Sequence, residues 1–364
     1  MRRTALALGL LISVAAAPAV AGEASYSTAD YARARKFDAH VHANTTEPAF
    51  LDVARRDGFE MLSINVDYPD FPPLATQDEI ARTLRARAPS RFFYATTFSM
   101  QGWTRPGWAA AVSSRLDGAV AQGAVAVKIW KNVGMVERDD AGQLLSIENP
   151  VFDPVMARIA ALGVPLIAHQ GEPHNCWLPL ADMTTDNDRS YFAEHPQYHM
   201  YLHPEQPSYE ALMAARDGFL ARHAELSFVG AHLASLEWDV DRLAAFLDRF
   251  PNAVVDMAAR MTQLQYQSVR DAARVRAFLI RYQDRILYGS DLEFGAGSAP
   301  AAVRHEAHAF WLSDWRYLAT ADSQYVAAIK ARVPGLALPR SVIDKIYYRN
   351  ARRVFLKQDA ASAP

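Results

Sequence analysis

The chain contains eight short apolar runs rich in β-branched or aromatic residues, each with a polar or charged residue at or near its end. Runs of this length and composition, bounded by polar or turn-forming residues, predict buried β-strands. They lie at 35–42, 59–67, 91–99, 123–130, 163–170, 226–232, 252–258 and 285–291.

The segments between these runs have the spacing of amphipathic helices, which predicts helices over 77–88, 108–123, 150–163, 207–223 and 239–250. Several of these segments end at Gly or Pro just before the next run. Eight alternating strand and helix units between residues 35 and 291 predict an α/β fold, a (β/α)8 TIM barrel. The alternative is a doubly wound open sheet, which favours a glycine-rich turn after its first strand, and residues 40–48 contain no glycine.

One connection is much longer than the others. Residues 171–207 follow the fifth run and are rich in Pro, His and aromatic residues, where two to six residues are usual. Such a length predicts a lid-like insertion or binding element. Its His195, His199 and His203 are spaced four apart, but Pro196 and Pro204 argue against a continuous helix. We expect hydrogen-bonded histidines packed among aromatic rings, with a second metal site as the alternative.

Composition supports one large domain and gives no sign of a charged macromolecular partner. The chain is 51% hydrophobic, which can fill a sizeable core, and its 38 basic residues balance 40 acidic ones. This balance provides no electrostatic surface for nucleic acid or for a membrane. A lone cysteine, Cys176, excludes an intramolecular disulfide, and no internal repeat or linker marks a second domain within 22–364.

The N-terminal stretch predicts export. Residues 1–21 begin with Arg2 and Arg3, continue through an apolar run and carry small residues at Ala19 and Ala21, as a cleaved signal peptide does. The alternative is a membrane anchor, which the short apolar run and Pro18 disfavour. We therefore expect a periplasmic protein without membrane attachment after cleavage.

Ionisable residues stand at the ends of five of the predicted strands. These residues are His40, His42, Lys128, His169, His232 and Asp291. The C-terminal ends of barrel strands meet at one rim, so residues far apart in the sequence would converge there. His40 and His42 form an H-x-H pair, and two residues spaced in this way share a strand face. Imidazoles with a carboxylate suit zinc, and three or four such protein ligands leave a position on the metal for water.

Each of these residues also has a structural alternative when taken alone. His169 or His232 could be a hydrogen-bonded core histidine, Asp291 could cap a helix, and Lys128 could be an ion-paired lysine. Their joint placement at one rim favours a metal site.

The chain resembles the amidohydrolase superfamily, and within it amidohydrolase family 2, over roughly residues 36–356. The matching motifs are "FDAHVH", "VKIWKN", "IAHQGEP", "GAHLASLEW", "LYGSD" and "YYRNARRVF". The resemblance implies that His40, His42, His169 and Asp291 bind one divalent metal ion, most simply Zn²⁺ with Mn²⁺ as the alternative. It also implies that His232 polarises the substrate or assists proton transfer. If Lys128 were carboxylated, it and His232 would hold a second metal, but we expect one.

A metal with an open position predicts hydrolysis of an ester, lactone or amide-type bond in a small molecule, with Asp291 taking up the proton of the attacking water. The alternatives are nonoxidative decarboxylation of an unsaturated or aromatic acid, with His232 as proton donor, and a periplasmic binding protein without turnover. Glu172 is a candidate base or partner of a ligand histidine, or else an exposed loop carboxylate. Arg260 is the first candidate to bind a substrate carboxylate, ahead of Lys131, Trp177 and Arg189. A homo-oligomer is compatible with the sequence.

Overall fold

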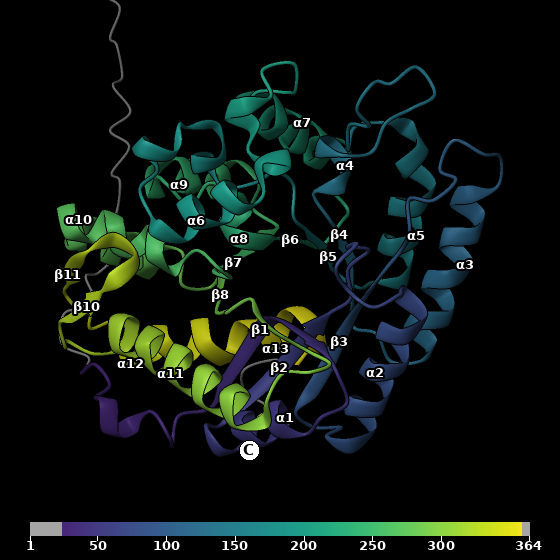
Figure 1. Cartoon of the computed structure of the whole chain (residues 1–364). Coiled ribbons are helices and arrows are strands. Elements are labelled where there is room, and N and C mark those ends of the chain that lie inside the picture. Colours follow the sequence, from purple (N-terminus) through teal and green to yellow (C-terminus); the bar gives the residue numbers. More distant parts are fainter. Residues whose placement is uncertain (1–23, 359–364) are drawn as a thin grey trace, which may run out of the picture.

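All eight predicted strands form, and they lie in one parallel sheet in the computed structural model, which describes residues 24–358 (Figure 1). They are β1 (Lys36–Asn44), β2 (Phe59–Ile64), β3 (Phe92–Thr97), β4 (Ala126–Ile129), β5 (Leu166–Ala168), β6 (Phe228–Gly230), β7 (Ala253–Asp256) and β8 (Ile286–Leu287). A short strand β9 (Leu292–Gly295) follows β8 and pairs in parallel with β1.

The sheet closes on itself. Its strand order runs from β8 through β7 and onward to β1 and then β9, and β8 and β9 are consecutive in the chain. Hydrogen bonds from Ala39 N to Tyr288 O (2.9 Å) and from Asp291 N to His40 O (2.8 Å) complete the seam. The predicted TIM-barrel fold is therefore confirmed.

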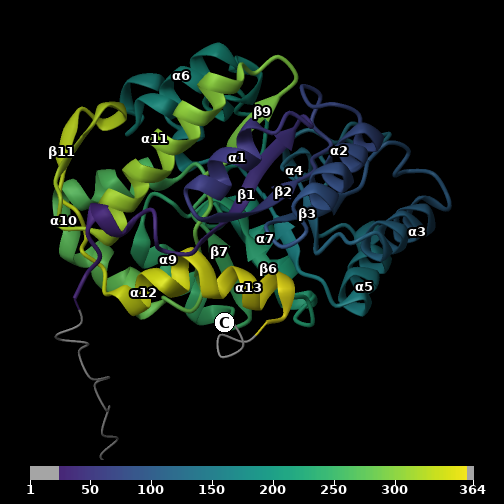
Figure 2. The same cartoon turned by 90° about the horizontal axis from the view of Figure 1, so that it is seen from below.

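Helices cover the outside of the barrel, as Figures 1 and 2 show. The predicted helices correspond to α2 (Leu74–Arg87), α3 (Trp108–Ala121), α5 (Asp153–Leu162), α7 (Tyr209–Arg222) and α9 (Val240–Arg249). Each has an apolar face toward the strands; α9, for example, buries Leu243, Phe246 and Leu247. The other helices of the outer ring are α1 (Ala49–Arg56), α10 (Met261–Arg281) and α11 (Pro300–Ala319).

The C-terminal helices close one end of the barrel. Chain segments α12 (Arg340–Asp344), a π-helical turn over Lys345–Arg349 and α13 (Asn350–Leu356) lie together there (Figure 2). Tyr348 and Phe355 pack against Phe37, Leu62 and other side chains that the strands send inward. Because this cluster fills the barrel at the N-terminal ends of the strands, the cavity opens at their C-terminal ends.

Strand β1 changes phase along its length. Phe37 and Ala39 belong to the interior cluster, whereas Val41 and Ala43 pack in the layer between strands and helices. The pairing of β1 with β2 is irregular between Asp38 and Val41, as at a β-bulge. This irregularity turns both histidines of the H-x-H pair toward the cavity.

The long connection after β5 folds into short helices. It contains 3₁₀ turns at His174–Trp177, Leu180–Asp182, Pro196–Tyr198 and Met200–Leu202, and the helix α6 (Asp186–Glu194). Its small core includes Cys176, Phe192 and Met200. Each of the three evenly spaced histidines contacts a backbone carbonyl, as predicted. His195 and His199 also stack on Tyr191 and Phe192, whereas His203 makes polar contacts, with Pro196 O and Glu205. Its action as a lid stays a prediction.

No helix within residues 24–358 is long and apolar enough to span a bilayer. The predicted signal peptide, residues 1–21, lies outside the described residues.

Candidate metal centre

The six ionisable residues predicted at strand ends line one cavity of about 550 Å³. His40 and His42 lie on β1, and Lys128 lies on β4. His169 follows β5 and His232 follows β6. Asp291 lies in the connection between β8 and β9 and has a positive φ of 68°. The closed barrel therefore brings together residues from five places in the sequence.

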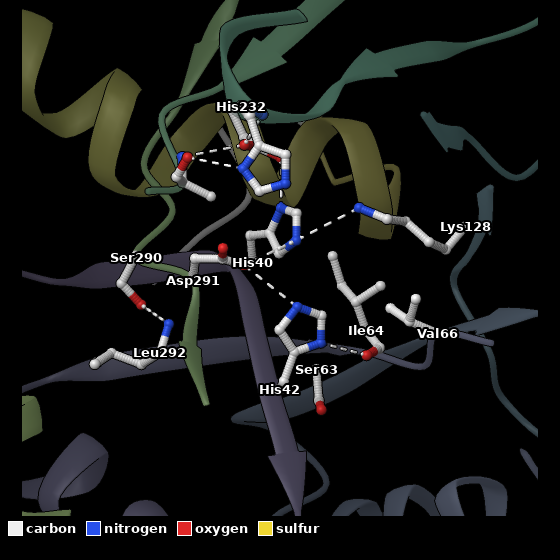
Figure 3. Close-up of polar contacts among 12 residues, drawn as sticks. His40, His42, Ser63, Ile64, Val66, Lys128, His232, Ser290, Asp291 and Leu292 are labelled. Atoms are coloured by element: carbon white, nitrogen blue, oxygen red, sulfur yellow. Dashed lines mark hydrogen bonds and ion pairs between the residues drawn. The ribbon is translucent and has the colours of Figure 1, made fainter. Parts of the chain in front are cut away.

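The histidines converge on Asp291 (Figure 3). Its Oδ1 atom lies 3.4 Å from His40 Nε2 and 3.3 Å from His42 Nε2. Candidate ligand atoms of His40, His232 and Asp291 all lie within 4.8 Å of one another. The ring of His169 lies 4.2 Å, centroid to centroid, from that of His232.

Hydrogen bonds on the outer side of the rings fix which nitrogen faces the centre. The Nδ1 atoms of His40, His42 and His232 contact Asp256 Oδ2 (2.9 Å), Ile64 O (2.8 Å) and Ala258 O (2.9 Å). A carbonyl or carboxylate oxygen accepts, so Nδ1 carries the proton and Nε2 presents a lone pair to the cavity.

The donor set fits a divalent cation. The Nε2 atom of His169 is buried and has no hydrogen-bond partner among residues 24–358, which is the state of a nitrogen that a metal ion would satisfy. Neutral imidazole nitrogens and one carboxylate are ligands that Zn²⁺ accepts. His40, His42, His169 and Asp291 remain the predicted ligands, with His232 beside them.

Burial keeps the imidazoles neutral. It lowers the pKa of His40, and it lowers the pKa of His169 and His232 well below the usual value for histidine. Burial also lowers the pKa of Lys128 to about 8, and the Lys128 Nζ atom lies 3.5 Å from His40 Nε2. Neutral rings are the form that binds a metal ion.

Asp256, at the end of β7, is a residue that the sequence analysis missed. Its side chain contacts His40 Nδ1 and accepts hydrogen bonds from the backbone N–H groups of His232 (2.9 Å) and Ala258 (3.1 Å). It is 1% exposed. One carboxylate thus orients the ring of His40 and holds the backbone of His232 and of Ala258, whose carbonyl contacts the His232 ring. The sequence did contain a signal for Asp256, because this residue lies at the end of a buried strand as the other candidates do.

Besides the six strand-end residues, three of the five remaining candidates for catalysis or substrate binding, Lys131, Glu172 and Arg260, line the same cavity. Lys131 and Glu172 form a buried ion pair, and Lys131 also lies over the rings of Trp130 and Tyr191. Arg260 lines the cavity and is 8% exposed. Its Nη1 donates to Ala259 O (3.2 Å), while its buried Nε has no hydrogen-bond partner among the described residues.

The structure does not bring the other two candidates to this cavity. Trp177 packs in the long connection and donates from Nε1 to Pro207 O (3.2 Å). Arg189 binds Asp186 and the carbonyl oxygens of Leu180 and Met183. Their role in substrate binding stays a prediction.

Aromatic residues that the sequence analysis did not single out form much of the cavity wall. They are Tyr68, Phe71, Trp130, Tyr191 and Phe192. Tyr68 packs against Phe71 and Trp130, with ring centroids 5.2 and 4.9 Å apart. These residues come from loops after three different strands, so no local pattern in the sequence could group them.

Structural comparison finds solved structures to which the chain is similar. A 2,6-dihydroxybenzoate decarboxylase from Rhizobium is 18% identical, with 89% of this chain and 99% of that chain covered and a TM-score of 0.50. A zinc-bound amidohydrolase from Burkholderia multivorans is 12% identical, covers 89% and 99%, and has a TM-score of 0.44. A lactonase from Listeria monocytogenes is also 12% identical, covers 89% and 95%, and has a TM-score of 0.44. At such identity the likeness to the decarboxylase shows the fold alone.

No curated protein sequence matches the chain. The model of the amidohydrolase family, however, matches residues 10–356, which is nearly the whole chain. The chain belongs to the amidohydrolase family.

Proposed function

We propose that the protein is a metal-dependent hydrolase that cleaves an ester, lactone or amide-type bond in a small molecule bearing a carboxylate. The observation that carries this proposal is the convergence of imidazole Nε2 atoms and Asp291 in a cavity that also contains Arg260. The family is enzymatic, which favours turnover over mere ligand capture.

His40, His42, His169 and Asp291 would hold one divalent ion, with Zn²⁺ proposed and Mn²⁺ as the alternative. Such an ion can lower the pKa of a water molecule to about 7 and polarise a carbonyl oxygen. The cavity walls hold the substrate beside the Nε2 atoms, and the hydrogen bonds on the Nδ1 atoms keep the rings from turning.

The groups nearest the centre are proton acceptors. Asp291 as a carboxylate only accepts, and its Oδ1 atom lies 3.4 Å from His40 Nε2 and 3.3 Å from His42 Nε2. His232 keeps its proton on Nδ1, so its Nε2 also accepts. This arrangement suits removal of a proton from the attacking water, as hydrolysis requires.

Arg260 is the proposed binding group for the substrate carboxylate. The charge of Lys131 is matched by Glu172, whereas Arg260 makes one contact to a backbone carbonyl and keeps an unsatisfied Nε. A carboxylate would satisfy that donor with a charge-assisted hydrogen bond. The aromatic wall would contact the apolar part of the substrate.

Nonoxidative decarboxylation is the second candidate. The aromatic wall and Arg260 also suit an aromatic acid, the kind of substrate named for the decarboxylase from Rhizobium. That reaction needs a proton donor to carbon, and His232 would have to carry its proton on Nε2 instead. The position of the ring proton therefore favours hydrolysis.

The test combines metal analysis with a substrate screen. Purified protein is expected to contain about one zinc per chain and to hydrolyse carboxylate-bearing members of a panel of esters, lactones, amides and aromatic acids. His232→Asn is expected to lower kcat by at least about 100-fold. Arg260→Met is expected to raise KM for carboxylate substrates by about 10–100-fold, and Arg55→Met, at an exposed helix position, serves as the matched control.

Other outcomes would decide against the proposal. Carbon dioxide as the product would favour the second candidate. Tight ligand binding without turnover would favour a binding protein, and protein without bound metal would contradict the proposed centre.

We also propose that the protein is exported and that residues 1–21 are removed. N-terminal sequencing of the protein from the periplasmic fraction is expected to begin at Gly22. An intact Met1 in that fraction would contradict cleavage.

A further inference from the structure

His232 begins a left-handed turn of four consecutive residues, none of which is glycine. The φ angles of His232, Leu233, Ala234 and Ser235 are 58°, 56°, 54° and 57°. L-residues visit this region as single residues rather than in runs. A run of four persists only where its surroundings hold it, and residues held in this region cluster at functional sites.

Helix α7 holds the carbonyl oxygens of this turn. Arg216 donates from Nη1 to Ala234 O, and Tyr209 donates from Oη to Ser235 O (2.5 Å). Both side chains are almost fully buried, with exposures of 3% and 4%. The Tyr209 hydroxyl in turn accepts a hydrogen bond from Trp238 Nε1 (2.9 Å). The two donors therefore have fixed positions.

The turn is also tied to the loop after β5, which carries the candidate ligand His169. Ser235 Oγ donates to Gly171 O (2.7 Å), two residues after His169. Ala234 packs so closely against β6 that a Cβ placed on Gly230 would lie 2.6 Å from the Ala234 Cβ. The turn is therefore held from α7, from the loop after β5 and by contact with β6.

We infer that Arg216, Tyr209 and Ser235 are positioning residues that hold the left-handed turn and thereby keep the imidazole of His232 at the metal centre. They do not line the cavity, so they act through His232 rather than on a ligand. The inference rests on the proposed function in giving His232 a role at that centre.

Two substitutions at Ser235 separate positioning from stability. Ser235→Ala removes the bond to Gly171 O and keeps a side chain at φ 57°, whereas Ser235→Gly removes the same bond but adopts this φ without strain. We expect the glycine variant to melt at the higher temperature of the two. We expect both variants to lose about 10-fold in kcat and to show an altered visible absorption spectrum when loaded with Co²⁺.

Tyr209→Phe tests the same function from helix α7. It removes the donor to Ser235 O and is expected to change the Co²⁺ spectrum and to lower kcat by about 10-fold. Tyr282→Phe is the matched control, because its hydroxyl contacts Asp248 and the Ala244 carbonyl on the outer wall. The control is expected to change melting temperature only.

A purely structural role would make activity and spectrum follow stability. If Ser235→Gly regained the wild-type spectrum and kcat as its melting temperature rose, the inference would be overturned. The spectrum needs no substrate, so a changed spectrum with no turnover by wild type would support the inference and reject the proposed function. Wild-type protein that bound no Co²⁺ would overturn both.

Discussion

At the scale of single residues, Asp256 has the widest influence on the candidate centre without facing its cavity. It contacts the outer nitrogen of His40 and accepts the backbone N–H of His232. Burial acts to raise its pKa, but the contacts with His40 together with the nearby His232 and Lys128 outweigh burial, so the pKa lies below its usual value. An ionised partner raises the basicity of a ligand ring and fixes its orientation.

Asp256→Asn is therefore expected to weaken Zn²⁺ binding by about 10–100-fold, because the amide is neutral and can present its NH₂ group to His40. Competition with a chromophoric chelator would measure the dissociation constant. Asp284→Asn, on the surface beside Lys345, is the control. Equal zinc affinities of Asp256→Asn and wild type would contradict this role.

At the scale of secondary-structure elements, the irregularity in β1 decides where the H-x-H pair points. A strand with strict alternation could send either Phe37 and Ala39 or the two histidines inward, but not both sets. The structure sends both inward because the register shifts between Asp38 and Val41. The bulge thus lets one strand contribute Phe37 and Ala39 to the packed barrel interior and both histidines to the cavity at the C-terminal ends of the strands.

The side chain of Asp38 holds this bulge. It accepts hydrogen bonds from Ser290 N (3.0 Å), His40 N (3.2 Å) and Trp311 Nε1 (2.8 Å), and it is fully buried. Asp38→Asn would oppose its NH₂ group to one of these donors, and we expect a loss of about 1.5–3 kcal/mol in the free energy of unfolding.

A double-mutant cycle tests this reason for the loss. In Asp38→Asn combined with Trp311→Phe the opposing indole donor is absent, so the pair is expected to be less destabilised than the sum of the single variants. Urea unfolding of all four proteins measures the coupling. Strict additivity would show that the indole contact does not matter.

The positions of the elements could be predicted from the sequence, but their local departures from regularity could not. The eight runs could be recognised as strands because strands of a buried parallel sheet consist of continuous apolar residues, and all eight form strands in the structure. The convergence of His40, His169, His232 and Asp291 followed from the topology of a closed barrel. The bulge and the left-handed turn depend on neighbours distant in sequence, such as Trp311 at the bulge and Arg216 at the turn. Each left-handed residue costs about 1–2 kcal/mol, and contacts from distant residues offset that cost.

At the scale of the whole molecule, the metal ion should also stabilise the fold. The candidate ligands come from β1, from the loop after β5 and from the junction of β8 and β9, so an ion joining them ties the seam of the barrel together. Zinc at 100 times its dissociation constant is expected to add about 2.7 kcal/mol to the free energy of unfolding. Calorimetry with and without a chelator measures this, and His42→Ala should abolish the difference between the two scans.

Buried carboxyl groups make the stability of the barrel depend on pH in a direction that can be derived. Burial raises the pKa of Asp314 to about 8, and Tyr288 Oη donates to it (2.9 Å). Between about pH 4 and pH 8 the unfolded chain releases this proton while the folded chain retains it, so the free energy of unfolding falls as pH rises, by at most about 1.4 kcal/mol per pH unit. Asp314→Asn has no proton to release, and its stability should fall less steeply across the same window. Urea unfolding of the metal-free proteins measures the slope of the free energy of unfolding against pH, with Asp284→Asn as control. Parallel slopes for wild type and Asp314→Asn would show that Asp314 is already ionised in the folded barrel at low pH.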